Sequence, residues 1–384
     1  MILYTVQPGD SLDSIAARYG ISSGTIAYDN QIPYPYALTP GAGLLLSQAS
    51  MQLTAADIAV TESDRYAYSG GYAYPFINRW ILEQTLPYLS DLFVFSYGFT
   101  PEGSLIPPLW DDSFMISLAK EMGTAPILTL TPFGPDGLFN NALIHSIVNS
   151  PDASARLIGE LTVQMEARGF AGVDIDFEYV LSEDRIPFAE FVKKVHDAMD
   201  PLGCITSVAL APKTSDNQEG LLYGGKDYAL LGAAADYVLL MTYEWGYTYG
   251  PPMAVAPLDK VRQVVEYALT RIPADKINLG IANYGYDWPL PFERGVTKAR
   301  TLGNIEARQI AVSQGVPIEF DEQGQSPHFT YRSGNIEHEV WFEDVRSIHG
   351  KYSLVREYGL RGMSTWQIMQ LFRGMWLLQN AEFL

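Results

Sequence analysis

Residues 170–180 read FAGVDIDFEYV, which is the composition of a buried strand except for three carboxylates. Side chains alternate along a strand, so Asp174, Asp176 and Glu178 point to one side. The apolar residues between them point to the other side, where a layer of helices could cover them. The stretch therefore predicts a strand whose acidic face lines the interior of a fold, with Glu178 nearest the carboxyl end.

Residues 54–384 contain further apolar, strand-like runs, which alternate with amphipathic helical stretches. The strand candidates are 55–61, 91–97, 126–131, 171–178, 205–211, 236–243, 277–284 and 361–366. Such strands are typical of parallel sheets buried on both faces, and eight of them predict an α/β fold of the (β/α)8 TIM-barrel type. A doubly wound open sheet is the alternative, but no glycine-rich phosphate-binding turn follows the first strand.

The segment at about 290–345 breaks the alternation before the last strand. It contains a helix-like part at 304–313 and a hairpin-like part at 318–342. We expect a small α+β insertion between the seventh and eighth barrel strands.

The three acids suggest a chemistry once they are placed in a barrel. These barrels carry their active sites at the carboxyl ends of the strands, where Glu178 would lie. Neighbouring acids in a low-dielectric interior repel one another, which raises at least one pKa. A carboxyl that is still protonated near neutral pH can protonate a glycosidic oxygen. The alternative is a structural set of acids that binds a cation or pairs with arginines.

The N-terminal residues 1–48 form a separate pattern of strand, helix, helix and strand. The first helix can be capped by Asp10 or Ser11 and can end at Gly20. A second short helix is expected at 23–28, and a loop rich in Pro and Gly leads to the final strand. The pattern predicts a small βααβ module ahead of the barrel, which would occupy 54–384.

This N-terminal stretch resembles a LysM module. The resemblance is carried by YTVQPGDSLDSIAARYGIS from Tyr4, by NQI at 30–32 and by LTPG at 38–41. LysM modules bind N-acetylglucosamine-containing glycans, so the resemblance implies a glycan groove between two loops. The implied groove residues are Gly9, Asp10, Ser11, Asn30, Gln31 and Ile32.

The acidic strand is similar to the Asp-x-x-Asp-x-Asp-x-Glu signature of glycoside hydrolase family 18. The first acid of that signature is Ala171 here, which departs from the family pattern. The resemblance implies that Glu178 is the general acid and base, and that Asp176 orients the substrate's acetamido group. It also implies that Tyr243 donates its hydroxyl to the acetamido oxygen and that Asp174 modulates the proton of the pair.

Further motifs fall in places where this family contacts sugar. LLMTYEWGY at 239–247 resembles the strand-six motif, MSTW ends at Trp366, and NYGYDW follows the seventh strand. The predicted substrate contacts are Trp366, Met241, Glu244, Trp245, Tyr284, Tyr286, Asp287, Trp288 and Tyr97.

A narrower resemblance, to the spore-associated branch of the family, covers essentially the whole chain. It implies an N-acetylglucosaminidase that acts on peptidoglycan of the spore cortex or cell wall. Chitin-like glycans are the alternative substrate, and a lectin-like protein that binds glycan without cutting it is the alternative function. No signal peptide is recognised, so we expect assembly onto the spore from the mother-cell cytoplasm.

Composition limits the partners. The 384 residues contain 25 Lys and Arg against 44 Asp and Glu, a formal net charge of −19, which disfavours nucleic acid and anionic membranes. The single cysteine, Cys204, excludes a disulfide within the chain. The five histidines show no metal-ligand spacing, so we expect no metal. We also expect no cofactor and a monomer.

Overall fold

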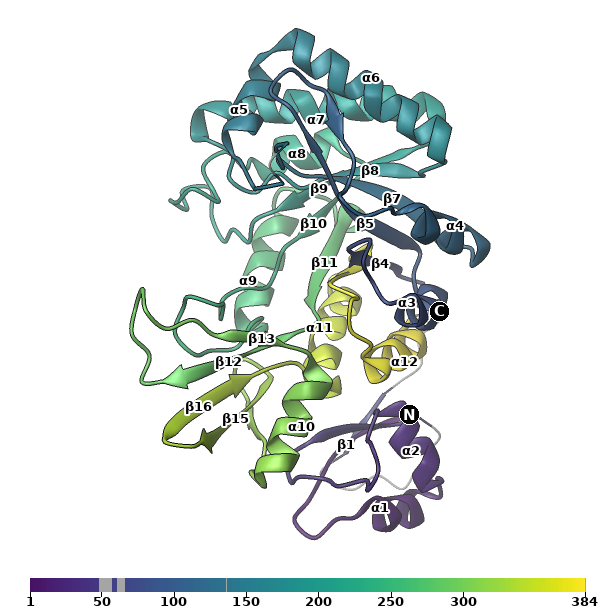
Figure 1. The fold of residues 1–384 in the computed structure, drawn as a ribbon, viewed down its shortest axis with the longest axis vertical. Helices are drawn as coiled ribbons and strands as arrows, with labels where there is room; N and C mark the ends of the chain where they lie inside the picture. The colour runs from purple at the N-terminus through teal and green to yellow at the C-terminus, as the bar shows by residue number, and fades with distance from the viewer. Residues whose placement is uncertain (48–56, 61–65, 136, 384) are drawn as a thin grey trace.

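The structure is a computed structural model that describes residues 1–47, 57–60, 66–135 and 137–383. Figure 1 shows the N-terminal module at one end of the long axis and helices α5, α6 and α7 at the other. The barrel lies between them, and an additional sheet flanks the barrel near the module.

The N-terminal module has the predicted order of elements. It consists of β1 (Ile2–Thr5), α1 (Leu12–Tyr19), α2 (Ser23–Asp29) and β2 (Gly43–Leu46). Ser11 caps α1 through a capping box, and Gly20 ends the helix at φ 67°, a left-handed conformation that suits glycine. A further strand, β3 (Asp57–Ala59), pairs antiparallel with the other edge of β1.

In the described part of the chain, eight parallel strands form a closed barrel, and the pairing of β4 with β5 completes the ring. The (β/α)8 prediction is therefore confirmed. The barrel strands are β4 (Tyr68–Ala73), β5 (Asp91–Phe99), β7 (Ala125–Leu130), β8 (Gly172–Ile175), β9 (Ile205–Leu210), β10 (Tyr237–Leu240), β11 (Ile277–Ala282) and β17 (Gly362–Trp366). A two-residue strand, β6 (Leu105–Ile106), pairs with the end of β5.

Helices surround the barrel and share one apolar core with the outward faces of the strands. They are α3 (Arg79–Thr85), α4 (Ser113–Glu121), α5 (Ala142–Asn149), α6 (Pro151–Arg168), α7 (Arg185–Met199), α8 (Tyr228–Ala234), α9 (Leu258–Leu269), α11 (Val345–Glu357) and α12 (Arg373–Glu382). Phe177 illustrates the packing, because its ring lies 5.7 Å from that of Phe188 and 5.8 Å from that of Phe191, both on α7.

The first barrel strand is not the predicted one. The predicted run at 55–61 is described only at 57–60, where it joins the N-terminal module as β3, and the barrel begins instead with β4. The sequence YSGGYA of β4 does not look like an apolar strand because glycines occupy its centre. A Cβ on Gly70 would come closer than 3.0 Å to Phe93 and Ser364, so the tight interior requires glycine there.

The predicted insertion before the last strand is also confirmed. It forms a five-stranded antiparallel sheet in the order β13-β12-β16-β15-β14. Its elements are β12 (Gly285–Leu290), β13 (Arg300–Leu302), α10 (Asn304–Gln314), β14 (Glu319–Asp321), β15 (Ser326–Ser333) and β16 (Ile336–Trp341).

The module is docked firmly on the rest of the chain. Arg308 of α10 donates hydrogen bonds to the carbonyl oxygens of Asn30 and Gln31. Arg346 of α11 donates to the carbonyl oxygen of Gly41 at 2.8 Å. The Gln31 amide donates to the Leu371 carbonyl oxygen at 3.1 Å, so three separate contacts fix the module to the insertion and the barrel.

None of the described helices is both long and apolar enough to span a bilayer.

Candidate active site

The three acids lie on the side that the predicted alternation indicates, although only Asp174 is within β8. Asp174 is completely buried inside the barrel, Asp176 is 7% exposed and Glu178 is half-buried at the rim. The strand ends at Ile175, but Asp176 still donates its backbone N–H to the Leu130 carbonyl oxygen of β7 at 2.9 Å. The barrel backbone therefore fixes Asp176 at the carboxyl end of the strands.

The two aspartates differ in their hydrogen bonds. Asp174 accepts one from the Tyr72 hydroxyl at 2.9 Å and one from the Ser207 hydroxyl at 2.7 Å. Asp176 Oδ1 is buried and has no hydrogen-bond partner among the residues that the structure describes. Buried polar atoms are normally paired, so this oxygen is available to a donor from a ligand.

Burial sets the proton affinity of the three acids. It raises the pKa of Asp174 to about 6. The pKa of Asp176 lies well above its usual range because of burial and the neighbouring charges of Glu178 and Asp174. The pKa of Glu178 is also raised by burial, an effect that the positive charge of Lys226 partly offsets. The group therefore retains protons that exposed acids would release.

Lys226 is a buried lysine whose positive charge lowers the pKa values of these acids. Its ammonium group donates to the Ala209 carbonyl oxygen at 2.9 Å, and burial lowers its pKa to about 8. Sequence analysis did not single out this residue, because a lysine in the irregular stretch after β9 carries no pattern of its own.

The acids open into a cleft of about 720 Å³ at the carboxyl ends of the strands, within the range of small-molecule sites. Of the predicted residues, the cleft is lined by Asp176, Glu178, Met241, Tyr243, Glu244 and Trp366. Trp245 lines a smaller adjoining hollow together with Glu178 and Tyr243.

Trp366 is surrounded by other rings, which makes one side of the cleft aromatic. Its ring lies 4.8 Å from Phe95, 5.7 Å from Tyr72 and 6.1 Å from Tyr74. A broad apolar face of this kind suits the ring of a bound sugar.

Sequence analysis missed much of this aromatic wall. The additional lining residues are Tyr74, Phe95, Phe133, Phe139, Tyr179, Leu222 and Tyr247. A usable signal was present, because Tyr74, Phe133 and Tyr179 follow β4, β7 and β8 within a few residues, at the rim where barrel sites form.

Tyr97 was predicted as a substrate contact, and the structure corrects this. Its side chain is 1% exposed and lies in the core between strands and helices, where its hydroxyl donates to Asp112 at 2.7 Å. The register of β5 against β7 is irregular between Val94 and Tyr97. This irregularity reverses the alternation, so Tyr97 faces away from the side that Phe95 occupies.

The residues of NYGYDW, at 283–288, are not among the residues that line the cleft. The hydroxyls of Tyr284 and Tyr286 both donate to Glu244 Oε1, so they hold that carboxylate in place. Asp287 accepts hydrogen bonds from Tyr331 and pairs with His338 inside the insertion. Trp288 is fully buried, and its indole N–H donates to Gly250. Asp287 and Trp288 are therefore parts of the insertion sheet, contrary to their prediction as contacts.

The predicted groove residues of the N-terminal module have mixed environments. Asp10 accepts hydrogen bonds from the Tyr4 hydroxyl and the Gln7 backbone, and Ser11 caps α1. Gly9 adopts φ 88°. Asn30 and Ile32 are buried, at 3% and 6% exposure.

The amide of Asn30 bonds both the N–H and the carbonyl of Leu45. This side chain therefore holds the module together and is not free to contact a glycan, which corrects its prediction as a groove residue.

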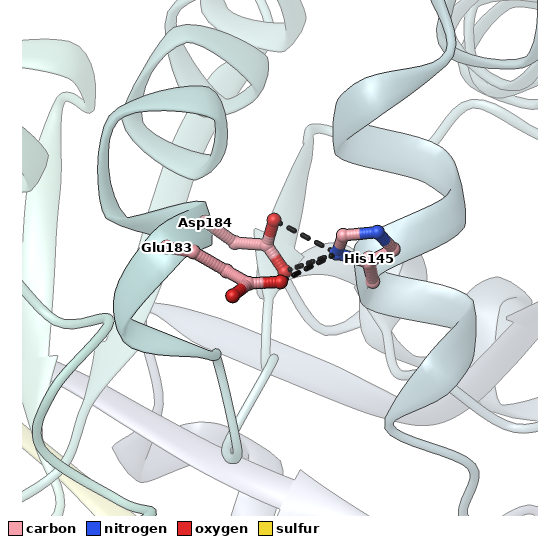
Figure 2. Close-up of side chains that lie close together, drawn as sticks. All are labelled: His145, Glu183 and Asp184. Atoms are coloured by element: carbon pink, nitrogen blue, oxygen red, sulfur yellow. Dashed lines mark hydrogen bonds and ion pairs between the residues drawn. The ribbon is translucent and has the colours of Figure 1, made fainter.

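A second cluster of charged side chains lies at the start of α7, outside the cleft lining (Figure 2). His145 Nδ1 is 2.9 Å from Asp184 and 3.9 Å from Glu183, and the donor atoms of the three lie within 4.8 Å of one another. Asn149 also donates to Asp184 at 2.7 Å. The spacing of histidines in the sequence could not reveal this group because its members come from separate elements.

The barrel places a carboxyl group with a raised pKa in a cleft at the carboxyl ends of its strands, which is an arrangement that a glycosidase can use to protonate the departing oxygen. A family model described as glycosyl hydrolases family 18 matches residues 139–370, and a LysM domain model matches residues 4–47. The chain belongs to glycosyl hydrolase family 18.

Relatives match over the whole length. The cortical fragment-lytic enzyme of Bacillus subtilis is 36% identical over 100% of this chain and 98% of its own length. The crystal structure of the spore cortex-lytic enzyme SleL of Bacillus megaterium is similar with a TM-score of 0.91 at 30% identity, over 99% of this chain and 97% of that one. A chitinase structure from Chromobacterium violaceum has a TM-score of 0.76 at 26% identity and covers 82% of this chain and 98% of its own.

Proposed function

We propose that this glycosidase hydrolyses β-1,4 bonds at N-acetylglucosamine in peptidoglycan fragments of the spore cortex or cell wall. The observation that carries the proposal is the unpartnered Oδ1 of Asp176 beside Glu178 in a cleft lined by Trp366. A sugar with an acetamido group would supply the N–H donor that this buried oxygen lacks. The names of the relatives, which act on cortical fragments and spore cortex, support this substrate class.

The reaction begins with a proton from Glu178. Its raised pKa favours the protonated carboxyl, and the proton passes to the departing glycosidic oxygen. This family is an exception to the mechanism with two enzyme carboxylates, because the substrate provides the nucleophile. The carbonyl oxygen of the 2-acetamido group attacks the anomeric carbon as the glycosidic bond breaks, which gives an oxazolinium ion.

Asp176 and Tyr243 orient the attacking group. Asp176 accepts the acetamido N–H and stabilises the positive charge that develops on the ring. The Tyr243 hydroxyl donates to the acetamido oxygen, a role for which it remains protonated, since burial and the nearby acids hold its pKa well above the usual value. Glu178 then takes a proton from water as the water attacks the anomeric carbon and the bond from that carbon to the acetamido oxygen breaks, so the acetamido group is restored and the product retains the original configuration.

Asp174 acts from beneath as a positioning group. Its two hydroxyl partners, Tyr72 and Ser207, fix its carboxylate, and its charge raises the pKa of Asp176. In this reading, Ala171 removes only the outermost acid of the family signature, and Asp174, Asp176 and Glu178 are sufficient for the reaction.

We further propose that the chain works as a monomer associated with the spore or wall, where the LysM module provides affinity for N-acetylglucosamine-containing glycan. The cleft and the module belong to one chain, and the net charge of −19 supports neither nucleic acid nor an anionic membrane as a partner.

The decisive experiment replaces Glu178 by Gln, which keeps the shape and removes the proton. We expect the rate of reducing-end release from cortex fragments to fall by at least about 10²–10⁴-fold, the usual contribution of a general acid. Circular dichroism and the melting temperature should match the wild type. Substantial activity in Glu178→Gln would overturn the assignment.

Chitin oligomers are the second candidate substrate, because the catalytic groups need only an acetamido sugar and the chitinase neighbour shares the fold. Mass spectrometry of products from cortex fragments and from chitin oligomers, at equal sugar concentration, separates the two. Faster cleavage of chitin oligomers would favour the second candidate.

A further inference from the structure

A groove of about 550 Å³ lies where the N-terminal module meets the barrel. It is lined on one side by α2 and the loop after it, and on the other by residues at the starts of α3 and α12. Figure 1 shows α2 below α12, with α3 nearby. Four of its aromatic side chains are unusually exposed: Tyr28 at 62%, Tyr34 at 84%, Tyr36 at 43% and Trp80 at 55%.

The walls of this groove are held in fixed positions. The Arg373 guanidinium lies 4.2 Å from the centre of the Tyr28 ring and donates to Gln84 at 2.8 Å. The Arg373 backbone N–H donates to Gln31 Oε1 at 2.7 Å, which ties the start of α12 to the module. Tyr34 and Tyr36 stand nearly perpendicular, with ring centres 5.8 Å apart and an angle of 83°. The Tyr28, Tyr34 and Tyr36 rings therefore have neighbours that restrict their positions before a ligand binds.

The groove opens on the same end of the barrel as the catalytic cleft. Trp80 follows β4, and Tyr74 just beyond the end of β4 lines the cleft. Leu371 follows β17, and Trp366 at the end of β17 also lines the cleft. Leu371 and Trp366 are five positions apart in the sequence, so they are separated by at most about 18 Å. One polymer of a few sugar units can therefore reach from one site to the other.

The composition of the groove identifies the class of occupant. Exposed Tyr and Trp rings with polar tips suit a ligand that presents both C–H faces and hydroxyls, as a sugar does. Arg373 adds a positive charge in a chain with a net charge of −19, and it can attract a carboxylate on the glycan or its peptide side chain.

We propose that this groove is a second glycan subsite, formed jointly by the module and the barrel, that holds the peptidoglycan strand being cut in the cleft. The inference rests on the proposed function for its substrate class. The subsite shares Gln31 and Ile32 with the groove implied by the LysM resemblance, but Gly9, Asp10 and Ser11 do not line it, and Trp80 and Arg373 of the barrel do.

The test compares long and short substrates in the full chain. Trp80→Ala removes a ring from the barrel side, and Tyr34→Ala removes one from the module side. Tyr66→Ala is the matched control, since Tyr66 is 57% exposed but precedes β4 at the opposite end of the barrel. The measured quantity is the ratio of kcat/KM for long glycan strands to kcat/KM for a disaccharide-length substrate that fills only the cleft.

We expect this ratio to fall about tenfold in Trp80→Ala and in Tyr34→Ala, the effect of losing roughly 1.4 kcal/mol of ring contact, and to stay unchanged in Tyr66→Ala. Ratios equal to the control in both variants would overturn the subsite. A fall in Tyr34→Ala alone would overturn its joint construction.

A binding measurement keeps this test separate from the proposed function. In a Glu178→Gln background, Trp80→Ala should weaken binding to insoluble cortex peptidoglycan by a similar factor. If the wild type cleaves cortex fragments and Trp80→Ala binds them normally, the subsite fails and the proposed function stands. If the wild type cleaves no peptidoglycan, the proposed function fails, and with it the assigned occupant.

Discussion

Two aspartates of nearly equal burial serve opposite purposes in this molecule. Asp344, 6% exposed, accepts hydrogen bonds from the backbone N–H groups of Arg346 and Ser347 and from the Arg346 guanidinium. Asp176, 7% exposed, keeps an oxygen with no partner among the described residues. The two acids thus have similar burial but differ in their hydrogen bonds, and Asp176, unlike Asp344, lines the cleft.

The two environments have different energetic consequences. Asp344 caps α11, and its partner Arg346 reaches across to the N-terminal module, so this acid contributes to folding and docking. The buried Oδ1 of Asp176 has no hydrogen-bond donor among the described residues, and a substrate N–H would supply one. Each prediction below tests one side of this contrast.

The largest expected effect is on catalysis at Asp176. In Asp176→Asn the group can no longer stabilise positive charge, and kcat should fall by about 10²–10³-fold, as when one preorganised electrostatic contact is lost. The melting temperature should stay close to that of the wild type, because Asn has nearly the same shape as Asp and the raised pKa of Asp176 already favours its uncharged form. Steady-state kinetics and calorimetry on one preparation check both, and a variant that melts earlier yet retains its turnover would contradict the contrast.

Asp344→Ala should have the converse result. Removing one member of a buried ion pair together with a helix cap should lower the free energy of unfolding by about 3 kcal/mol. Far below the melting temperature, kcat on a short substrate should remain within a few-fold of the wild type. Urea unfolding gives the first quantity. Unchanged stability would show that Asp344 does not have the structural role assigned to it.

Asp174 lies between these extremes and gives a pH-dependent prediction. Its pKa is raised from 3.8 to about 6 by burial, so it contributes stability that is present below about pH 4 and lost as the pH rises through 6. Asp174→Asn cannot ionise, so its stability should fall less over this interval. Unfolding curves from pH 4 to pH 7 test this, and parallel pH dependence in both proteins would refute it.

The smallest expected effect concerns Lys226. Its charge lowers the pKa values of Asp176 and Glu178, so Lys226→Met should raise both and move the bell-shaped pH profile of kcat/KM to higher pH. The comparison uses a short substrate, which confines the effect to the cleft. A shift toward lower pH would show that another interaction controls the acids.

The acidic strand was predicted well because its signal is local. A period of two placed Asp174, Asp176 and Glu178 on one side, and the chain keeps that alternation beyond the end of β8 at Ile175. The same reasoning failed at Tyr97, where an irregular register reversed the faces. It also failed at β4, whose glycines are required by neighbours far away in sequence.

Features that depend on packing between distant segments could not be found in this way. The hydrogen bonds that hold Glu244 come from β12 and the residue before it, and Lys226 acts from beneath the cleft. The groove at the module boundary combines residues near positions 30, 80 and 371, and no linear motif joins them.

The contacts that Arg308, Arg346 and Gln31 make across the module boundary have a consequence for how the enzyme would travel over its substrate. A flexible linker would let the barrel reach glycosidic bonds over a wide radius around the glycan-bound module. A rigidly docked module allows the barrel to reach only glycosidic bonds at one distance and angle from the module. Once those glycosidic bonds are cleaved, the whole molecule has to dissociate and bind again at another place. Turnover on intact wall would therefore follow the rate of dissociation.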